Sequence, residues 1–333
     1  MDTIAAMKKW LLIYGMWFVA VGVICGQTIT VVWPDRSSMP ARIGDQGRME
    51  AGAYVATQGQ EKSTRIRQWN ADAAVRLLQT GYDHLAIGLN IRQEQVSTLF
   101  RSQQVAAGIA YRRELNEPRA DFRNIVGAGV QLGLYHLNLD AGDWIFSSQF
   151  NDQLYQFDPA INSNEQLSGV NWSSNVQPVV HAGLYYRLMT GPWTMLLVPS
   201  FATLNTPSLD MDGWSYVLPS QMQLLGQLEY RDTEQVTLGA EGWYTRLEKL
   251  SDLQLQGYIR IGKQDREETT FQLGGILGVN RDPNEVQFMH GGLQARIRWK
   301  DHLAGLRVED ALSRVNRWGT RLLIQYRYVL RDE

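Results

Sequence analysis

The residues best suited to acid–base chemistry near neutral pH are the five histidines of this 333-residue chain. They are scattered, with no His-x-x-x-His spacing, at His84, His136, His181, His290 and His302. A hydrolase site needs a serine beside a histidine. Ser102 and His84 could be placed that way on adjacent strands, but nothing else in the sequence supports the pair. We therefore predict no enzyme activity, no catalytic residue and no cofactor, and we expect His84 and His181 to be polar side chains that fill an interior.

The sequence also gives little support for a metal site or for nucleic-acid binding. The stretch Leu209–Gly213 resembles part of a calcium loop through Asp210 and Asp212, but it lacks the glutamate that would complete the site, so a solvated turn is the simpler interpretation. Cys25 is the only cysteine and lies in the expected leader, which excludes disulfides and thiolate metal sites from the mature chain. A net charge of -2 provides no basic field for nucleic acid.

The N-terminus has the composition of a secretory leader. Lys8 and Lys9 precede the apolar run Trp10–Cys25, and we assign residues 1–26 to a signal peptide cleaved near Gly26. Two alternatives stay open: an uncleaved membrane anchor, and a lipoprotein that begins at Cys25, although Ile24 is bulky for that site. After the leader, no run of ~18 apolar residues predicts a transmembrane helix.

Residues 84–91 alternate between bulky apolar side chains and small or polar ones, so that the two kinds occupy opposite faces of a strand. The same alternation recurs at 126–134, 180–188 and 321–328. An outer-membrane barrel has this pattern, because its bulky face meets lipid and its polar face lines the lumen. The predicted lipid-facing residues are Leu85, Ile87, Leu89, Ile91, Val130, Leu132, Leu184, Leu322 and Ile324.

The pattern predicts an all-β fold, a single antiparallel outer-membrane β-barrel over residues 49–330 with about 14 strands (range about 12–16). The expected strands include separate ones at 63–70 and 72–80 and one at 213–218. Aromatic residues near the ends of these runs should form two interfacial girdles: Trp69, Tyr82, Phe100, Tyr111, Trp193, Tyr230, Trp243, Tyr244, Trp299 and Trp318. A soluble β-sandwich is the alternative, since alternation alone does not separate the two folds. The leader, the lack of cysteine and the many long runs favour the barrel.

Two segments lie outside this pattern. Residues 27–48 are turn-rich and predict an extended, plug-like N-terminal segment. The connection near 140–176 is too long to be idle in a compact domain. Its aromatic and acidic residues are the candidates for partner binding: Trp144, Phe146, Phe150, Tyr155, Phe157 and Asp158. They could instead pack back into the barrel mouth.

An ordered series of strand motifs resembles the PorP/SprF family, outer-membrane proteins of the type IX secretion system in Bacteroidota. The motifs are Arg67-Gln68-Trp69, Ala86–Ile91, Val105–Arg112, the Gly-rich Gly127–Leu139, a long Asp/Asn/Pro loop at Phe150–Ser168, and Ala182–Tyr186. The sequence departs from the family at Pro40–Gly44, where members carry an Asn-Pro-Ala-Tyr-Ala-Gly-like stretch, and at its end, where Val329–Glu333 follow the aromatic strand.

The resemblance implies a barrel that binds or anchors a secreted cargo protein or surface adhesin. It also implies other type IX secretion components and an outer-membrane lipoprotein as partners, besides the outer-membrane lipids. Two other functions stay open on the residues alone. One is an outer-membrane channel or transporter for small solutes, which would need an unobstructed polar lumen. The other is a soluble β-sandwich adhesin or binding module.

Overall fold

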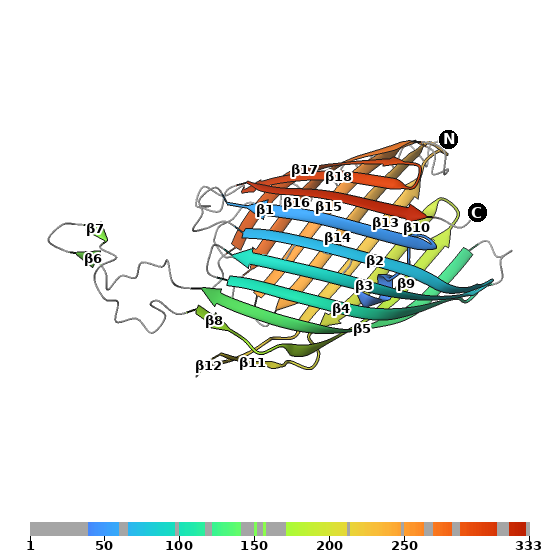
Figure 1. Cartoon of the computed structure of the whole chain (residues 1–333). Coiled ribbons are helices and arrows are strands. Elements are labelled where there is room, and N and C mark those ends of the chain that lie inside the picture. The colour runs from blue at the N-terminus through green and yellow to red at the C-terminus, as the bar shows by residue number, and fades with distance from the viewer. Residues whose placement is uncertain are drawn as a thin grey trace.

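Fourteen antiparallel strands close into a barrel in the computed structural model (Figure 1). The structure describes residues 39–59, 66–96, 100–116, 122–140, 150–151, 156–157, 171–211, 214–247, 250–262, 269–281, 287–311 and 320–330. The barrel strands are β1 (Met49–Gln58), β2 (Ile66–Thr80), β3 (Asp83–Val96), β4 (Phe100–Glu114), β5 (Phe122–Asp140), β9 (Gln177–Thr190), β10 (Trp193–Ala202), β13 (Gln221–Arg231), β14 (Val236–Leu247), β15 (Leu250–Ile261), β16 (Thr270–Arg281), β17 (Gln287–Trp299), β18 (His302–Ala311) and β19 (Arg321–Leu330).

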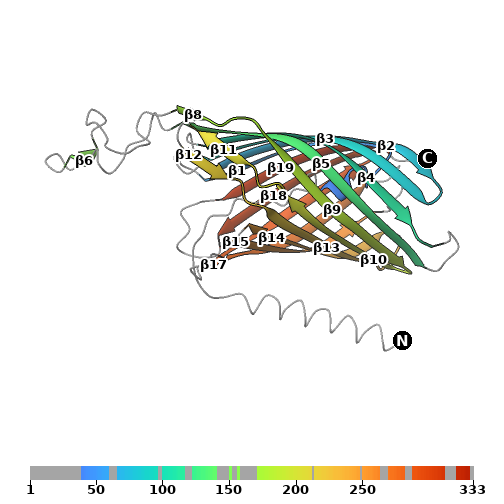
Figure 2. The same cartoon turned by 90° about the horizontal axis from the view of Figure 1, so that it is seen from below.

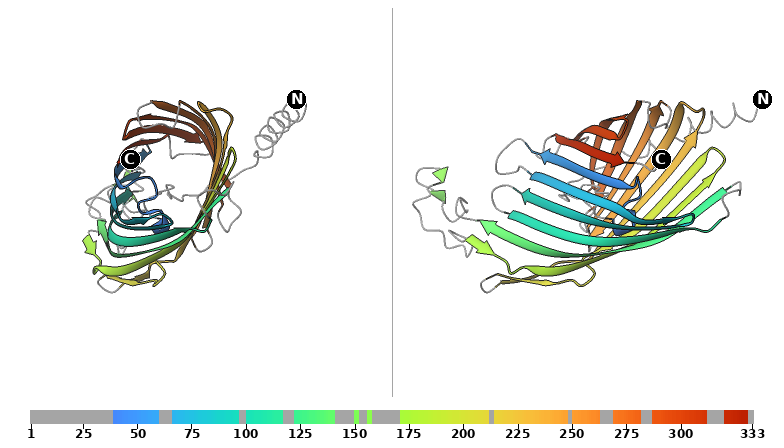
Figure 3. Two further views of the ribbon diagram at one scale, coloured as in Figure 1. Left: turned by 90° about the vertical axis from the view of Figure 1, so that its right-hand side faces the viewer. Right: turned by 45° about the vertical axis from the view of Figure 1, so that its right-hand side comes forward.

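The first and last strands pair with each other and close the ring. β1 lies between β2 and β19, in a register that sets Met49 opposite Leu330 and Gln58 opposite Arg321. Figure 3 (left) looks along the barrel and shows this ring of strands. Closure pairs the backbone N–H and C=O groups of every barrel strand on both sides, which is what a sheet needs in order to cross a hydrocarbon layer. The predicted fold class is confirmed.

The two faces of the wall differ in the way that the alternation predicts. Large apolar side chains face outward and are exposed, as at Leu293 (73% exposed), whereas Gln68 and Asn70 face inward and are 1% exposed. A soluble protein has the opposite arrangement. A wall with an apolar exterior and a polar interior suits a barrel surrounded by lipid.

The two ends of the barrel have different connections. At one end, which we call the turn end, two residues each join β2 to β3, β9 to β10 and β17 to β18. The first residue of β1 and the last residue of β19 also lie at this end. At the opposite loop end lie the long connections 141–176, 203–220 and 312–320. Since outer-membrane barrels have short periplasmic turns and long extracellular loops, the turn end faces the periplasm.

Short strands extend the loop end beyond the barrel (Figure 2). β8 (Asn171–Ser173) pairs with the last residues of β5, β11 (Ser208–Met211) pairs with β12 (Trp214–Val217), and β6 (Phe150–Asn151) pairs with β7 (Gln156–Phe157). The strand predicted at 213–218 is therefore β12, in a hairpin outside the barrel sheet. The two strands predicted at 63–70 and 72–80 are one strand, β2, because its alternation continues through Ala71.

Candidate functional site

The described N-terminal residues lie inside the barrel. Met39–Arg48, which we call the lumenal segment, contains the 3-10 helix η2 (Pro40–Arg42), visible in dark blue within the barrel in Figures 1 and 3. No helix in the described ranges is long and apolar enough to cross a membrane. Met39 and Ala41 are fully buried, and they cluster with apolar side chains of the inner wall: Tyr185 on β9, Leu196 and Val198 on β10, Leu225 on β13 and Trp243 on β14. One side of the lumen thus carries an apolar surface that the lumenal segment covers.

Three inward-facing glycines make room for the lumenal segment on the adjoining strands of the wall. A Cβ added to Gly129 would lie 2.4 Å from the main-chain carbon of Pro40. Cβ atoms added to Gly108 and Gly88 would lie 2.7 and 2.8 Å from the side chain of Ile43. Gly88 and Gly108 are direct cross-strand neighbours. These glycines on β3, β4 and β5 therefore allow a close approach that any larger residue would prevent.

Arginines fix the lumenal segment by its backbone carbonyls. Arg112 on β4 donates to the carbonyl oxygens of Gly44 (2.6 Å) and Ala41 (3.4 Å), and Arg76 on β2 donates to Gly44 at 3.3 Å. Charge-assisted hydrogen bonds of this kind are among the stronger ones in proteins. The segment is held through its backbone as well as through its side chains.

A buried ion pair lies within the lumenal segment. Arg42 Nε donates to Asp45 at 2.7 Å, and both side chains are about 5% exposed or less. Burial disfavours the charged carboxylate, but the positive charges of Arg42, Arg112 and Arg187 outweigh this effect and hold the pKa of Asp45 below its usual value. Burial also disfavours the charged form of Arg42, yet the neighbouring carboxylate of Asp45 raises the pKa of that guanidinium. The pair is ionised at neutral pH.

A second buried network lies toward the loop end. Glu309 on β18 is paired with Arg307, with His290 on β17 (3.0 Å) and with Arg321 on β19 (3.7 Å). Arg321 also donates to Gln58 on β1 at 2.8 Å, across the seam where the first and last strands meet. The network ties the closing strands together from the inside.

The histidines singled out in the sequence lie on five different strands, and Nε2 of His136 on β5 lies 3.2 Å from the hydroxyl oxygen of Ser173. His181 Nδ1 accepts the backbone N–H of Thr203 at 3.1 Å, and its Nε2 lies 2.7 Å from Gln104. Ser102 pairs with Glu94 while His84 pairs with Arg112, so the two lie at opposite ends of the β3–β4 pair. Asp210 Oδ1 accepts from Ser208, Asp212 lies outside the described residues, and no three metal-ligating side chains gather within the described ranges.

The residues predicted to face lipid lie on the outer face of the wall. Ile87, Leu89, Val130, Leu132, Leu184 and Ile324 are exposed. Leu85, Ile91 and Leu322 are half-buried and alternate with inward-facing Ala86, Asn90 and Leu323. One predicted girdle residue is placed wrongly: Trp243 is 6% exposed, faces the lumen and donates its indole N–H to Glu241 at 2.7 Å.

The loop candidates lie mostly outside the described residues: Trp144, Phe146, Tyr155 and Asp158. Phe150 and Phe157 pair with each other in the β6–β7 ladder. The base of the long connection is described, and it is bound to the β11–β12 hairpin. Asn175 Oδ1 accepts from the backbone N–H of Asp210 at 3.2 Å, and the Asn175 N–H donates to the Asp210 carbonyl at 3.4 Å.

A family model described as type IX secretion system membrane protein PorP/SprF matches residues 38–296, from the lumenal segment into β17. The chain belongs to the PorP/SprF family. This PorP/SprF protein is an outer-membrane β-barrel of the bacterial cell, and its family is that of the type IX secretion system. The matched range begins beside the lumenal segment, so the family pattern covers the residues that occupy the lumen as well as those of the wall.

Comparison with curated proteins finds no match for this PorP/SprF chain. Among solved structures, it is similar to the P. putida toluene transporter TodX, with 13% identity, a TM-score of 0.48, and coverage of 89% of this chain and 94% of that one. It is also similar to a Pseudomonas aeruginosa FadL homologue, with 10% identity, a TM-score of 0.46, and coverage of 87% and 92%. The Ralstonia pickettii toluene transporter TbuX has 12% identity, a TM-score of 0.40, and coverage of 88% and 92%.

Proposed function

We propose that this PorP/SprF barrel binds or anchors a secreted protein at the cell surface, together with associated lipoproteins, and that it does so through its loop end. The observation that carries the proposal is the position of the lumenal segment. It is buried inside the lumen against β4, β5, β9 and β10, and it takes up part of the space through which a solute would pass. A barrel with this segment in place is better suited to holding a partner outside its lumen than to conducting solutes through it.

The loop end offers the surface for such a partner. The wall continues past the barrel rim through β5, β8 and the β11–β12 hairpin, and the Asn175–Asp210 hydrogen bonds join these parts. In the sequence, the aromatic candidates for partner binding lie between β5 and β8, the two strands at the base of the long connection. Aromatic side chains, above all Trp and Tyr, supply much of the binding energy at protein interfaces.

The partners proposed from family membership are a secreted cargo protein or surface adhesin, other type IX secretion components and an outer-membrane lipoprotein. The apolar outer face supplies the contact with outer-membrane lipids. We propose no catalytic step in the binding of these partners.

Deletion of residues 145–170 tests the binding surface. The deletion should leave a heat-modifiable barrel in the outer membrane but abolish recovery of the partner after gentle detergent extraction and affinity purification. A shorter deletion of 313–318, in another loop-end connection, serves as the control and should retain the partner. Recovery of the same partner with the 145–170 deletion would refute the proposed surface.

Conductance in planar bilayers separates this proposal from a small-solute channel. The purified protein should give no steady open channels at neutral pH, because the lumenal segment stays in place. Deletion of residues 39–45 should produce steady openings. Stable channels from the unaltered protein would favour the solute channel and count against the anchoring function.

A further inference from the structure

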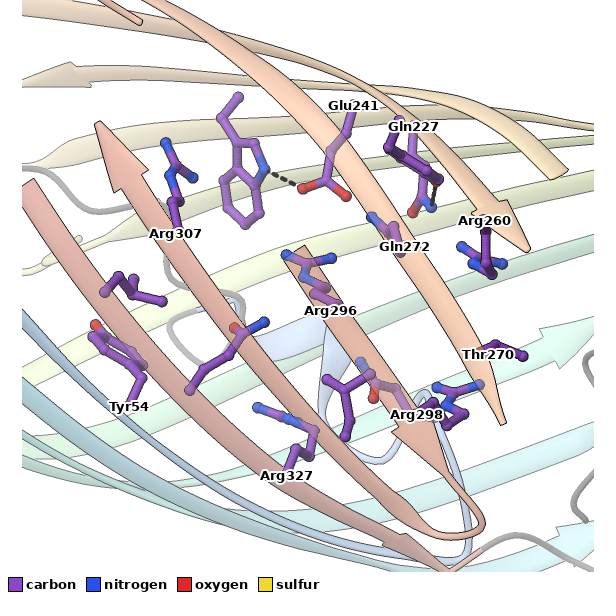
Figure 4. Close-up of a pocket in the computed structure, with 16 residues that line it drawn as sticks. Tyr54, Gln227, Glu241, Arg260, Thr270, Gln272, Arg296, Arg298, Arg307 and Arg327 are labelled. Carbon is purple, nitrogen blue, oxygen red and sulfur yellow. Dashed lines mark hydrogen bonds between the residues drawn. The ribbon is translucent and has the colours of Figure 1, made fainter. Parts of the chain in front are cut away.

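Arginines of the inner wall pair with carboxylates that the wall itself supplies. Figure 4 shows a lumenal cavity of about 170 Å³ with several arginines around it. Arg260 on β15 pairs with Glu229 at 2.5 Å, and Arg307 on β18 pairs with Glu309. These two ion pairs stabilise the wall from within. Arginines on the outer face call for a different explanation, because the outer face meets lipid.

Two arginines lie on the outer face of the wall, at the loop ends of β2 and β4. Arg67 is the cross-strand neighbour of Gln95 on β3, and Gln95 is in turn the neighbour of Arg101. These three residues, which we call the basic row, cross three strands, and both arginines are exposed. Since neighbouring strands lie about 4.8 Å apart, the Cα atoms of the two arginines are about 10 Å apart. Both guanidinium groups can therefore meet one molecule.

The outward-facing rows beside the basic row change from polar to apolar. The next row toward the middle of the barrel wall is polar apart from its tryptophan: Trp69, Gln93, Gln103 and His136. Gln103 donates to Gln93 at 3.1 Å. The row after it is apolar: Ala71, Ile91, Val105 and Leu134. A tryptophan at such a border is typical of the boundary between hydrocarbon and headgroups. The basic row thus lies just outside the hydrocarbon layer, and because the loop end is extracellular, it lies in the outer leaflet.

The acids near the basic row lie on its solvent side. Asp140, exposed at the end of β5, is two residues beyond Asn138, the cross-strand neighbour of Arg101. No ion pair joins Arg67 or Arg101 to another described residue. The connections 60–65, 97–99 and 141–149 continue from these strand ends outside the described residues, and they contain Glu61 and Asp143. The experiment below includes these acids, because neutralisation of both arginines by them would abolish any preference for an anionic lipid.

We propose that the basic row binds the phosphate group of an outer-leaflet lipid. Guanidinium groups bind phosphate oxygens through pairs of parallel hydrogen bonds. The amides of Gln93 and Gln103 supply neutral donors and acceptors for the rest of the headgroup. The acyl chains of the same lipid lie against the apolar row, where Val105 and Leu134 are exposed. The proposal does not rest on the anchoring function, because it concerns the lipid-facing surface and not the loops.

Native mass spectrometry of the purified full-length barrel in a non-ionic detergent tests the site. The probe is lipid A with its phosphate groups, and the comparison is the same lipid A after the phosphates have been removed. The phosphorylated form should bind about 10-fold more tightly or better, because hydrogen bonds between charged groups carry that much free energy. Equal binding of the two lipids would overturn the proposal. Displacement of the phosphorylated lipid by inorganic phosphate at equal concentration would overturn the assignment to a lipid.

The combined substitution Arg67→Gln and Arg101→Gln should weaken binding of phosphorylated lipid A about 10-fold or more, so that the two lipids bind alike. The matched control combines Arg113→Gln with Arg231→Gln, two exposed arginines at the turn end. It removes the same charge from the opposite end of the barrel and should keep the preference for the phosphorylated lipid.

Gln95→Glu is a second test, and it leaves both arginines in place. It sets a carboxylate directly opposite Arg67 and Arg101, and it should also weaken binding of the phosphorylated lipid about 10-fold. Gln235→Glu, at an exposed position of the turn between β13 and β14, is its control and should bind as the unaltered protein does. An undiminished preference in a folded Arg67/Arg101 double variant, or in Gln95→Glu, would overturn the proposal.

Discussion

Arg112 of β4 donates a hydrogen bond of 2.6 Å to the carbonyl oxygen of Gly44, so the inner wall holds the lumenal segment through a backbone atom. The contact requires glycine at position 44, because φ is +65° there and an added Cβ would lie 2.6 Å from the Cβ of Ala86. It also depends on the position of the backbone, which the glycines of β3, β4 and β5 allow to come close. The position of the segment and the composition of the wall are therefore linked.

Replacing Arg112 with Gln should loosen the lumenal segment. The lost bonds involve a charged donor, and bonds of that kind contribute about 1.5–3 kcal/mol each. A reporter cysteine, Ala41→Cys, is fully buried in the docked state, and the only native cysteine is Cys25. Maleimide labelling in intact membranes should be about 10-fold faster or more when Arg112→Gln is added. Arg101→Gln, an exposed position on the same strand, is the control and should leave the rate unchanged. Equal rates in both variants would show that Arg112 does not hold the segment.

Replacing Gly129 with Ala should displace the lumenal segment by direct contact. The new methyl group would lie 2.4 Å from backbone atoms of Pro40, which cannot rotate away as a side chain could. Overpacking of this kind costs about 1–3 kcal/mol. Labelling of Ala41→Cys should therefore become about five-fold faster or more. Gly257→Ala, where the added Cβ has open space, should label at the original rate. A Gly129→Ala protein that labels no faster than the Gly257→Ala control would contradict the close approach.

The wall could be predicted from the sequence because alternation has a period of two and a barrel has only two faces. Trp243 shows the limit of that reasoning. An aromatic residue near the end of a strand suits a lipid interface, but Trp243 shares its face with Glu241 and Thr245, both buried in the lumen. Its place in the alternation along the strand, rather than its residue type, decided which face of the wall Trp243 occupies.

The apolar part of the inner wall that Met39 covers has a recognisable pattern in the sequence, but simple alternation does not explain it. Met195–Val198 of β10 is apolar on both faces: Met195 and Leu197 are exposed outside, whereas Leu196 and Val198 are buried inside. A strand that is apolar on both faces is covered on both, here by lipid outside and by the lumenal segment inside.

Asp45 should make docking of the lumenal segment depend on pH only under strongly acidic conditions. Because its pKa is lowered in the docked state, the ion pair with Arg42 contributes its full stability above the usual aspartate value near 3.8, and loses it as pH falls through the docked pKa. Hydrogen exchange of a peptide covering residues 39–48 should show constant protection from pH 7 to 5, and a loss of protection below about pH 4. The matched variant Asp45→Asn removes the carboxylate, so it should be less protected at neutral pH and lack this transition. Loss of protection in the unaltered protein between pH 7 and 5 would rule out Asp45 as the responsible group.

Replacing Ile87 with Arg should impair insertion into the outer membrane. Ile87 is exposed on the outer face of β3, near the middle of the strand, where it alternates with inward-facing Ala86 and Gly88. An arginine on the lipid face near the bilayer midplane costs roughly 2–4 kcal/mol. The amount of heat-modifiable barrel in purified outer membranes should therefore fall several-fold. Tyr216→Arg introduces the same side chain on β12, outside the barrel sheet, and should insert normally. Normal levels of the Ile87→Arg protein would mean that this face of β3 does not meet lipid.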